Sequence, residues 1–167
     1  MKKTLTAILI LSSILLVRCK EEKPFSVQVV SSEMVRNVDG AHLDGMGGKL
    51  KWNYTTGLEL KAFLDVYDRY GDENIFRYVD GWYDSIIGPD GKILSYKIKN
   101  YSTDHICPGR TLFRLYDMTG KEKYRMAMDT LRKQISQHPR TSEGGFWHKM
   151  VYPDQMWLDG LDMAQPC

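Results

Sequence analysis

A repeat of 49 residues is the feature of this sequence that most constrains its fold. The motif Tyr-Asp-x-x-Gly begins at Tyr67 and occurs again at Tyr116. The same shift places apolar residues on apolar residues on both sides of the motif. It carries Phe63, Leu64, Ile75, Tyr78, Val79, Trp82 and Ile86 onto Leu112, Phe113, Tyr124, Ala127, Met128, Leu131 and Ile135. A period of this length, made of two helical segments, predicts stacked αα-hairpins and an all-α fold.

Apolar spacing sets the bounds of the predicted helices. Residues 75–86 show it most clearly, because their apolar side chains recur at spacings of 3, 1, 3, 1 and 3, which define one face of a helix. The Gly-Pro-Asp-Gly segment at 88–91 then ends that helix in a turn. The other predicted helices cover 52–71, 104–119 and 122–138, and a fifth begins at Asp154. Ahead of them, 27–35 forms either one short amphipathic helix or an extended arm.

Stacked hairpins either run on as an open solenoid or close into a toroid. In a toroid the first, third and fifth helices line the centre, and their N-termini open at one end. Asp104 lies at the start of the third helix, and Asp159 lies about one turn into the fifth. Both carboxylates are therefore expected at one mouth of a shared cavity, rimmed by the loops 88–103 and 139–153.

Composition fits one globular domain and excludes several functions. Of the 167 residues, 43% are hydrophobic and 26% charged, which is enough apolar surface for a core. The net charge of +2 comes from mixed signs without long basic runs, so no nucleic-acid partner is expected. No CxxC, HExxH or glycine-rich phosphate motif occurs, so we expect neither a metal nor another cofactor. The ten tyrosines and four tryptophans suit either a helical core or a sugar-binding cleft.

The N-terminal residues predict export. Residues 1–19 begin with two lysines and continue with an apolar stretch at 5–17 that is too short to span a bilayer. Cys19, followed by polar residues, resembles the lipidated cysteine of a bacterial lipoprotein signal, although Arg18 stands where a small residue normally precedes it. We expect a periplasmic protein, or one held at the outer membrane by a lipid on Cys19. Residues 20–50 are interpreted as a tether and lead-in, and 51–167 as the helical domain.

Two aspartates are the candidate catalytic residues. Asp104 is either a helix N-cap or a carboxylate that holds hydroxyl groups or a water. Asp159 lies among Trp157, Leu158 and Leu161, so it is predicted to be desolvated, which favours the protonated form of an acid. The alternative for Asp159 is a buried, hydrogen-bonded residue that fixes a loop.

Other candidate residues have a structural and a functional interpretation. His148 follows a Gly-Gly loop and either hydrogen-bonds within that loop or contacts a substrate. Tyr54 either stacks on a sugar or closes the end of the barrel, and Trp157 either walls the pocket of Asp159 or belongs to the core. Cys107 is most simply a small buried apolar residue, and with Cys167 it forms no recognisable disulfide framework.

Several motifs together resemble glycoside hydrolase family 105. The first is Trp-x-Tyr-x-x-Gly-Leu at 52–58, and the second is Asp104 followed by Gly-Arg at 109–110. Pro-Arg-Thr-x-x-Gly-Gly-Phe-Trp-His-Lys at 139–149 and Tyr-Pro-x-Gln-Met-Trp-Leu-Asp-Gly-Leu-x-Met at 152–163 are highly specific. The family comprises unsaturated rhamnogalacturonyl hydrolases, which are related to the unsaturated glucuronyl hydrolases of family 88. Its fold is an (α/α)6 barrel of the six-hairpin glycosidase type.

The resemblance implies an unusual glycosidase reaction. Its substrates are pectin-derived oligosaccharides with an unsaturated uronic acid, and the enzyme hydrates the C4=C5 double bond. By motif, Asp159 matches the general acid/base and Asp104 the second required aspartate. The substrate-binding positions matched by motif are Tyr54, His148, Trp157 and Met163.

The sequence also departs from the family pattern. Asp162 stands where the family generally has an aromatic residue, and the family continues for about as many residues again beyond 163–167. The arginine and tryptophan that bind the uronate in the family lie in that further part. The chain is therefore expected to form an incomplete barrel, the N-terminal half of the domain. The alternative function is an inactive fragment or a non-catalytic, sugar-binding lipoprotein of helical hairpins.

Overall fold

The computed structural model describes residues 22–43 and 48–164. The predicted signal peptide at 1–19, the lipidation candidate Cys19 and the terminal Cys167 lie outside these residues. In the described part the chain is helical, and its only β-structure is two isolated bridges, Ile87 with Ile93 and Arg140 with Phe146. The α-helices are α2 (Phe25–Arg36), α3 (Tyr54–Tyr70), α4 (Glu73–Ile86), α5 (Arg110–Thr119), α6 (Glu122–Gln137) and α7 (Gly160–Ala164). The 3-10 turns are η1 (Ile98–Asn100), η2 (Thr103–His105) and η3 (Cys107–Gly109).

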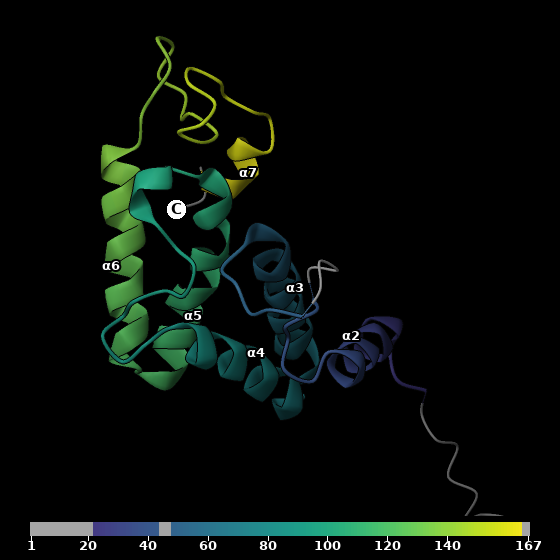
Figure 1. Ribbon diagram of the computed structural model, residues 1–167. Helices are drawn as coiled ribbons and strands as arrows, with labels where there is room; N and C mark the ends of the chain where they lie inside the picture. The colour runs from purple at the N-terminus through teal and green to yellow at the C-terminus, as the bar shows by residue number, and fades with distance from the viewer. Residues whose placement is uncertain (1–21, 44–47, 165–167) are drawn as a thin grey trace, which may run out of the picture.

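The repeated Tyr-Asp-x-x-Gly motif forms the turn of two hairpins, α3/α4 and α5/α6 (Figure 1). Gly71 ends α3 with φ +69°, and Gly120 ends α5 with φ +65°. In each case the glycine N–H donates to the tyrosine carbonyl four residues earlier, at 2.7 Å for both Tyr67 and Tyr116. Glycine is favoured there because a side chain is strained in the left-handed conformation. The predicted stack of αα-hairpins is therefore confirmed.

The core lies between the two hairpins and is rich in aromatic rings. Trp52 is 2% exposed, stacks on Trp82 at 6.3 Å between ring centroids and meets Tyr83 edge-on at 5.9 Å. The indole N–H of Trp52 donates to the His105 carbonyl at 2.7 Å, which ties the start of the first hairpin to η2. Segment 27–35 belongs to a helix and not to an extended arm, because α2 packs on both α3 and α4. No helix among the described residues is long and apolar enough to span a membrane.

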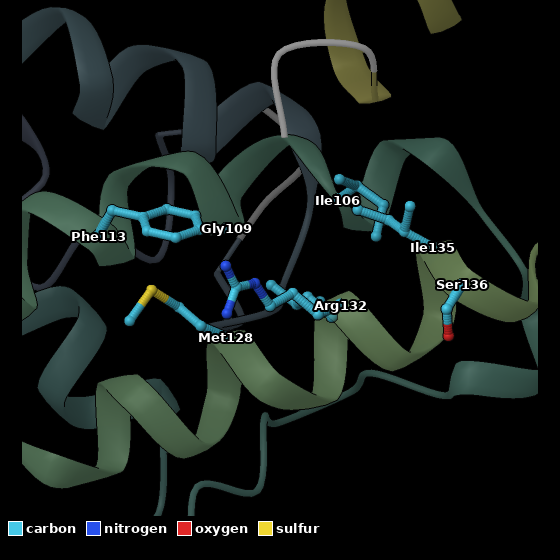
Figure 2. A pocket seen from close by; sticks show the side chains of 8 residues that line it. Ile106, Gly109, Phe113, Met128, Arg132, Ile135 and Ser136 are labelled. Carbon is cyan, nitrogen blue, oxygen red and sulfur yellow. The ribbon is translucent and has the colours of Figure 1, made fainter.

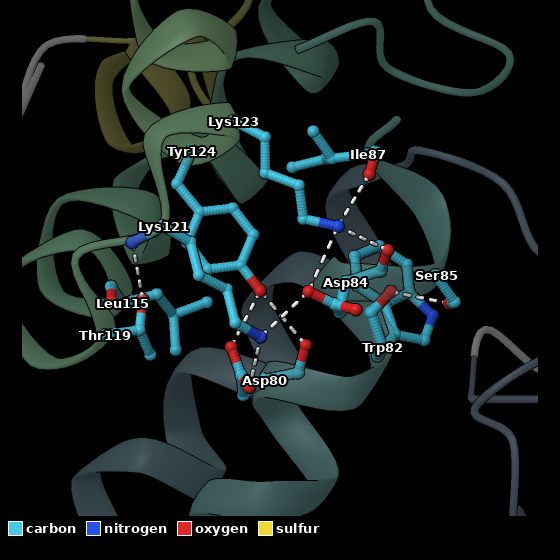
Figure 3. A network of polar contacts seen from close by, with 10 residues as sticks. All are labelled: Asp80, Trp82, Asp84, Ser85, Ile87, Leu115, Thr119, Lys121, Lys123 and Tyr124. Atoms are coloured by element: carbon cyan, nitrogen blue, oxygen red, sulfur yellow. Dashed lines mark hydrogen bonds and ion pairs between the residues drawn. The ribbon is translucent and has the colours of Figure 1, made fainter. Parts of the chain in front are cut away.

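Polar contacts join the two hairpins at one end (Figure 3). Lys121 at the start of α6 donates to the carboxylates of Asp80 and Asp84 of α4, both at 2.8 Å. The Tyr124 hydroxyl donates to Asp80 at 2.7 Å. Lys123 donates to the carbonyl of Ile87 at 2.9 Å. These contacts fix the register between α4 and α6.

Two predicted helix starts are wrong. The third helix begins at Arg110 and not at 104, because Pro108 supplies no N–H and disfavours the α-conformation in the residue before it. Residues 103–109 form the turns η2 and η3 instead, so Asp104 is not the N-cap of α5, which is Gly109. The fifth helix begins at Gly160 and not at Asp154, whose φ of +61° is incompatible with a right-handed helix.

Candidate active site

The centre of the candidate site is His148, which is only 2% exposed. Its backbone N–H donates to the Gln155 carbonyl at 2.7 Å, and its own carbonyl accepts from the Thr103 N–H at 3.0 Å. The first bond folds the loop between α6 and α7 on itself, and the second holds that loop against η2. His148 therefore has a fixed place between two segments that are far apart in the sequence.

Both candidate aspartates lie beside the His148 ring. Nε2 is 3.7 Å from Oδ1 of Asp104, and Nδ1 is 3.9 Å from Oδ1 of Asp159. The Thr103 hydroxyl lies 3.1 Å from Nδ1. One ligand atom from each of Asp104, His148 and Asp159 lies within 4.8 Å of the others. The two carboxylates therefore lie beside the same imidazole ring. Neither aspartate lies in the first turn of a long helix, as the predicted toroid had required.

Burial keeps His148 neutral. Desolvation lowers its pKa, Asp104 and Asp159 act in the opposite direction, and Lys149 lowers it further. A neutral imidazole presents one N–H and one lone pair, so the contacts with the aspartates are not ion pairs. Two carboxylates and an imidazole are also a set of ligands that can bind a divalent cation. The absence of a metal therefore stays a prediction from the sequence.

Lys149 belongs to the site but was not selected from the sequence. Its ammonium nitrogen lies 2.5 Å from Oδ2 of Asp104, whose side chain is only 14% exposed. The residue stands in the Trp-His-Lys motif at 147–149, directly after His148. Its pairing with Asp104 spans 45 residues and leaves no sign in the local pattern.

A stack of aromatic rings covers one side of the histidine. Trp157 lies parallel to the His148 ring, with the centroids 4.0 Å apart and 4° between the planes. Tyr152 stacks on Trp157 at 5.2 Å. The indole N–H of Trp157 donates to the Gln155 side chain at 3.2 Å, which fixes its plane. Trp157 is therefore not a core residue: it is 41% exposed and covers the ring of His148, whereas the pocket of Asp159 that it was predicted to wall stays open. Tyr152 was not predicted.

The predicted enclosure of Asp159 is wrong in this structure. Its side chain is 45% exposed, and its predicted neighbours Leu158 and Leu161 are 82% and 44% exposed. The segment 149–159 runs over the surface in turns, and the chain becomes buried again only at Met163 and Ala164 of α7. An apolar neighbour in the sequence desolvates an acid only if the fold covers both.

Of the other residues selected from the sequence, Met163 lies in a helix that packs on the turn of Asp104, and Tyr54 lies apart from the His148 cluster. Met163 is buried in α7, which packs against η2 and η3, the turns that carry Asp104 and Cys107. Cys107 is a buried free thiol, as predicted. Tyr54 is the first residue of α3 and is 39% exposed. No hydrogen bond or ring contact found in the described residues joins Tyr54 to the His148 cluster.

The model of the family "Glycosyl Hydrolase Family 88" matches residues 25–167. The chain belongs to glycosyl hydrolase family 88. Its fold is similar to that of a glycoside hydrolase from family 105 of C. acetobutylicum ATCC 824, with a TM-score of 0.76 and 39% sequence identity. The match covers 84% of this chain and 37% of that hydrolase, so the chain spans well under half of its length. The predicted relationship to families 105 and 88 and the incomplete helical-hairpin barrel are confirmed.

Proposed function

We propose that this family 88 chain removes an unsaturated uronic acid from pectin-derived rhamnogalacturonan oligosaccharides by hydration of the C4=C5 double bond. The observation that carries the proposal is the convergence of Asp104 and Asp159 on the buried, neutral ring of His148. Two carboxylates in different environments are suited to two roles, because Asp104 is paired with Lys149 and Asp159 is open to solvent. The family membership supports a glycosidase reaction and the motifs narrow its type.

In the proposed reaction Asp159 is the proton donor. It gives its proton to C4 of the enol ether, and its carboxylate then takes a proton from the water that adds at C5. The resulting hemiketal collapses and releases the neighbouring sugar. Proton transfer goes to carbon and not to a glycosidic oxygen, so the carboxylate separation that distinguishes retaining from inverting glycosidases does not apply.

The surrounding residues position the sugar. The oxygens of Asp104 accept hydrogen bonds from ring hydroxyls, and Lys149 balances the charge of that carboxylate. His148 lies between the two carboxylates, with Nε2 facing Asp104 and Nδ1 facing Asp159. Trp157 holds the histidine plane by stacking at 4.0 Å.

One observation favours a second candidate function. Asp159 is 45% exposed, whereas a proton donor to carbon works best in a site closed to bulk water. The chain would then bind the unsaturated saccharide without turning it over. Both candidates use the same residues, and turnover separates them.

The test is the loss of ultraviolet absorbance of an unsaturated rhamnogalacturonan disaccharide incubated with the 167-residue chain. If the proposal is correct, Asp159→Asn slows turnover by about 100-fold or more, because a general acid contributes a factor of this size. The matched control is Asp154→Asn, which changes an exposed aspartate of the same loop. Binding without turnover by the unmodified chain supports the second candidate, and equal rates for Asp159→Asn and the control exclude Asp159 as the donor.

We also propose export and lipid attachment at Cys19, on the basis of the sequence of residues 1–19. Expressed in bacteria with labelled palmitate, the chain is expected to take up label at the membrane, and Cys19→Ser is expected to take up none. Equal labelling of the two chains contradicts the lipid anchor.

A further inference from the structure

The helix α7 carries the proposed proton donor at its start. Asp159 directly precedes α7, and its carbonyl accepts hydrogen bonds from the N–H groups of Asp162 and Met163, both at 3.0 Å. Asp159 therefore moves together with the first turn of this helix. No hydrogen bond found in the described residues fixes its carboxylate, which lies 3.9 Å from Nδ1 of His148. The place of this carboxylate beside the histidine must then come from the way in which α7 is held.

Two kinds of contact hold α7 on the turns before α5. The first is apolar, because Met163 and Ala164 are buried and α7 packs on η2 and η3. The second is an ion pair, in which Nη2 of Arg110 lies 3.2 Å from Oδ2 of Asp162 and Nη1 lies 3.5 Å from Oδ1. It is the one ion pair found in the described residues that joins α7 to another helix. The sequence marks Asp162 only as a departure from the family pattern.

Arg110 is itself held in place, so it gives α7 a fixed partner. Its side chain is only 15% exposed, and its Nη2 and Nε lie 3.2 Å from Sγ and 3.4 Å from the carbonyl oxygen of Cys107 in η3. Although it begins α5, Arg110 does not line the groove between α5 and α6, where Phe113 and Arg132 face each other (Figure 2). Its guanidinium therefore joins η3 to α7 and takes no part in that groove.

The ion pair supplies a direction that the apolar contact lacks. Apolar burial is non-directional, so by itself it lets a short helix turn about its axis. A guanidinium and a carboxylate that meet through two parallel contacts restrict that rotation. The Asp162 side chain is 69% exposed, and exposed ion pairs add little to the free energy of unfolding. The pair is therefore suited to setting the orientation of α7 and not to stabilising the whole fold.

We propose that Arg110 and Asp162 are positioning residues, which orient α7 and thereby hold the carboxylate of Asp159 beside His148. Without the pair, α7 turns on its apolar contact, and Asp159 moves away from the ring because it has no hydrogen bond of its own. The inference rests on the proposed function for its effect on rate. The position of Asp159, however, can be measured without any turnover.

The first test is turnover of the unsaturated rhamnogalacturonan disaccharide by Asp162→Ala. Its kcat is expected to fall by about 10-fold or more, because a misplacement of about 1 Å costs up to about 100-fold in rate. KM and the free energy of unfolding in urea are expected to change little. Asp162→Glu keeps a carboxylate for Arg110 and is expected to restore most of the lost kcat. The matched control is Asp129→Ala, which removes an exposed aspartate that is paired with Arg125 on α6.

The second test follows the protonation of the His148 ring by nitrogen-15 NMR. Burial lowers the pKa of this ring, Asp104 raises it, Lys149 lowers it and Asp159 raises it. Asp159→Asn is therefore expected to lower the pH midpoint of the ring. Asp162→Ala is expected to lower it as well. The double variant should show less than the sum of the two changes, because Asp159 has then already left the ring.

The two tests separate this inference from the proposed reaction. If the unmodified chain gives no turnover, the proposed hydrolase function fails, and NMR alone decides whether the ion pair positions Asp159. Additive changes in the midpoint would overturn the inference, because Asp162 would then act on the ring through its own charge. A kcat and a midpoint of Asp162→Ala equal to those of Asp129→Ala would also overturn it.

Discussion

The Thr103 hydroxyl is the hydrogen-bond partner of Nδ1 of His148, so we expect it to influence which ring nitrogen carries the proton. The Thr103 hydroxyl lies 3.1 Å from Nδ1 and 3.2 Å from the His148 carbonyl, and it has only one hydrogen to donate. If that hydrogen goes to Nδ1, then Nε2 carries the ring proton and points it at Asp104, 3.7 Å away. This tautomer places an N–H, and not a lone pair, against a carboxylate, so we expect it to predominate.

Replacing this hydroxyl is therefore expected to change both the tautomer and the stability. Thr103→Val leaves Nδ1 of a buried histidine without its partner, so the free energy of unfolding is expected to fall by about 1–3 kcal/mol. Urea denaturation measures this change, and nitrogen-15 NMR of the His148 ring reports the tautomer. Thr103→Ser keeps the hydroxyl and serves as the control. An unchanged His148 spectrum in Thr103→Val would show that the hydroxyl does not select the tautomer.

At the residue scale, the sequence predicted the members of the site better than their surroundings. Asp104, His148, Asp159 and Trp157 stand in specific motifs, and the structure brings all four together. Motifs carry no information on distances across the chain, which is why the partner of Asp104 was not predicted. Exposure is likewise set by tertiary packing, so the apolar neighbours of Asp159 suggested a burial that the fold does not provide.

At the scale of elements, the contact between α3 and η3 holds the two hairpins together. Gly57 faces Pro108 with no room for a side chain, since an added Cβ would lie 2.6 Å from the proline Cα. Backbone atoms cannot move aside as a flexible side chain would. The glycine is therefore required by the packing of one hairpin on the other, although its own helix would favour alanine.

Two glycine substitutions in neighbouring helices are expected to have opposite effects. Gly57→Ala should lower the free energy of unfolding by about 1–3 kcal/mol, because it forces the hairpins apart. Gly81→Ala in α4 should raise it by about 0.5–1 kcal/mol, because an added Cβ there meets no atom within 4 Å and alanine favours the helix. Urea denaturation of both variants checks the pair. A similar change in the free energy of unfolding of both variants would mean that Pro108 moves away from residue 57 without destabilising the fold.

The elements themselves were predictable where the repeat applied and less so elsewhere. The bounds of α4 and α6 agree with the apolar spacing to within three residues. The starts of α5 and α7 were placed too early, because apolar periodicity continues through segments that Pro108 and the conformation of Asp154 exclude from an α-helix. A proline near a predicted start is therefore a better guide than periodicity.

At the scale of the whole molecule, buried histidines link the stability of the fold to pH. His105, His138 and His148 each have a pKa below the ordinary value of 6.5, with desolvation as the largest cause. In His138 the Trp147 carbonyl acts in the opposite direction, and in His105 Asp104 does so. His138 contacts the Trp147 carbonyl of the loop after α6, His148 contacts Thr103 of η2, and the partly buried His105 of η2 lies against the ring of Tyr96. Their titration therefore affects the parts of the chain that form the site.

Because burial lowers the pKa of each of these histidines, the fold is expected to lose stability as the pH falls. As pH falls below about 6.5, the unfolded chain binds protons at these histidines before the folded chain does, so the free energy of unfolding falls. Above that pH the three rings are neutral in both states and the contribution is constant. Each histidine adds at most about 1.4 kcal/mol per pH unit within this window. Paired carboxylates such as Asp84, whose pKa is lowered mainly by its hydrogen bond to Lys121, act only at lower pH.

Urea denaturation between pH 7.5 and 5.5 tests this prediction, with His138→Gln as the variant that separates one histidine from the others. His138 contacts the Trp147 carbonyl through Nε2 at 2.7 Å, and a glutamine amide offers a donor to the same carbonyl without titrating. The variant is therefore expected to lose stability less steeply with falling pH, by at most about one proton or 1.4 kcal/mol per pH unit. A stability that stays level or rises as pH falls through 6.5 would mean that the folded state admits imidazolium at these sites. The packing of the loop on η2 would then be looser than the buried rings indicate.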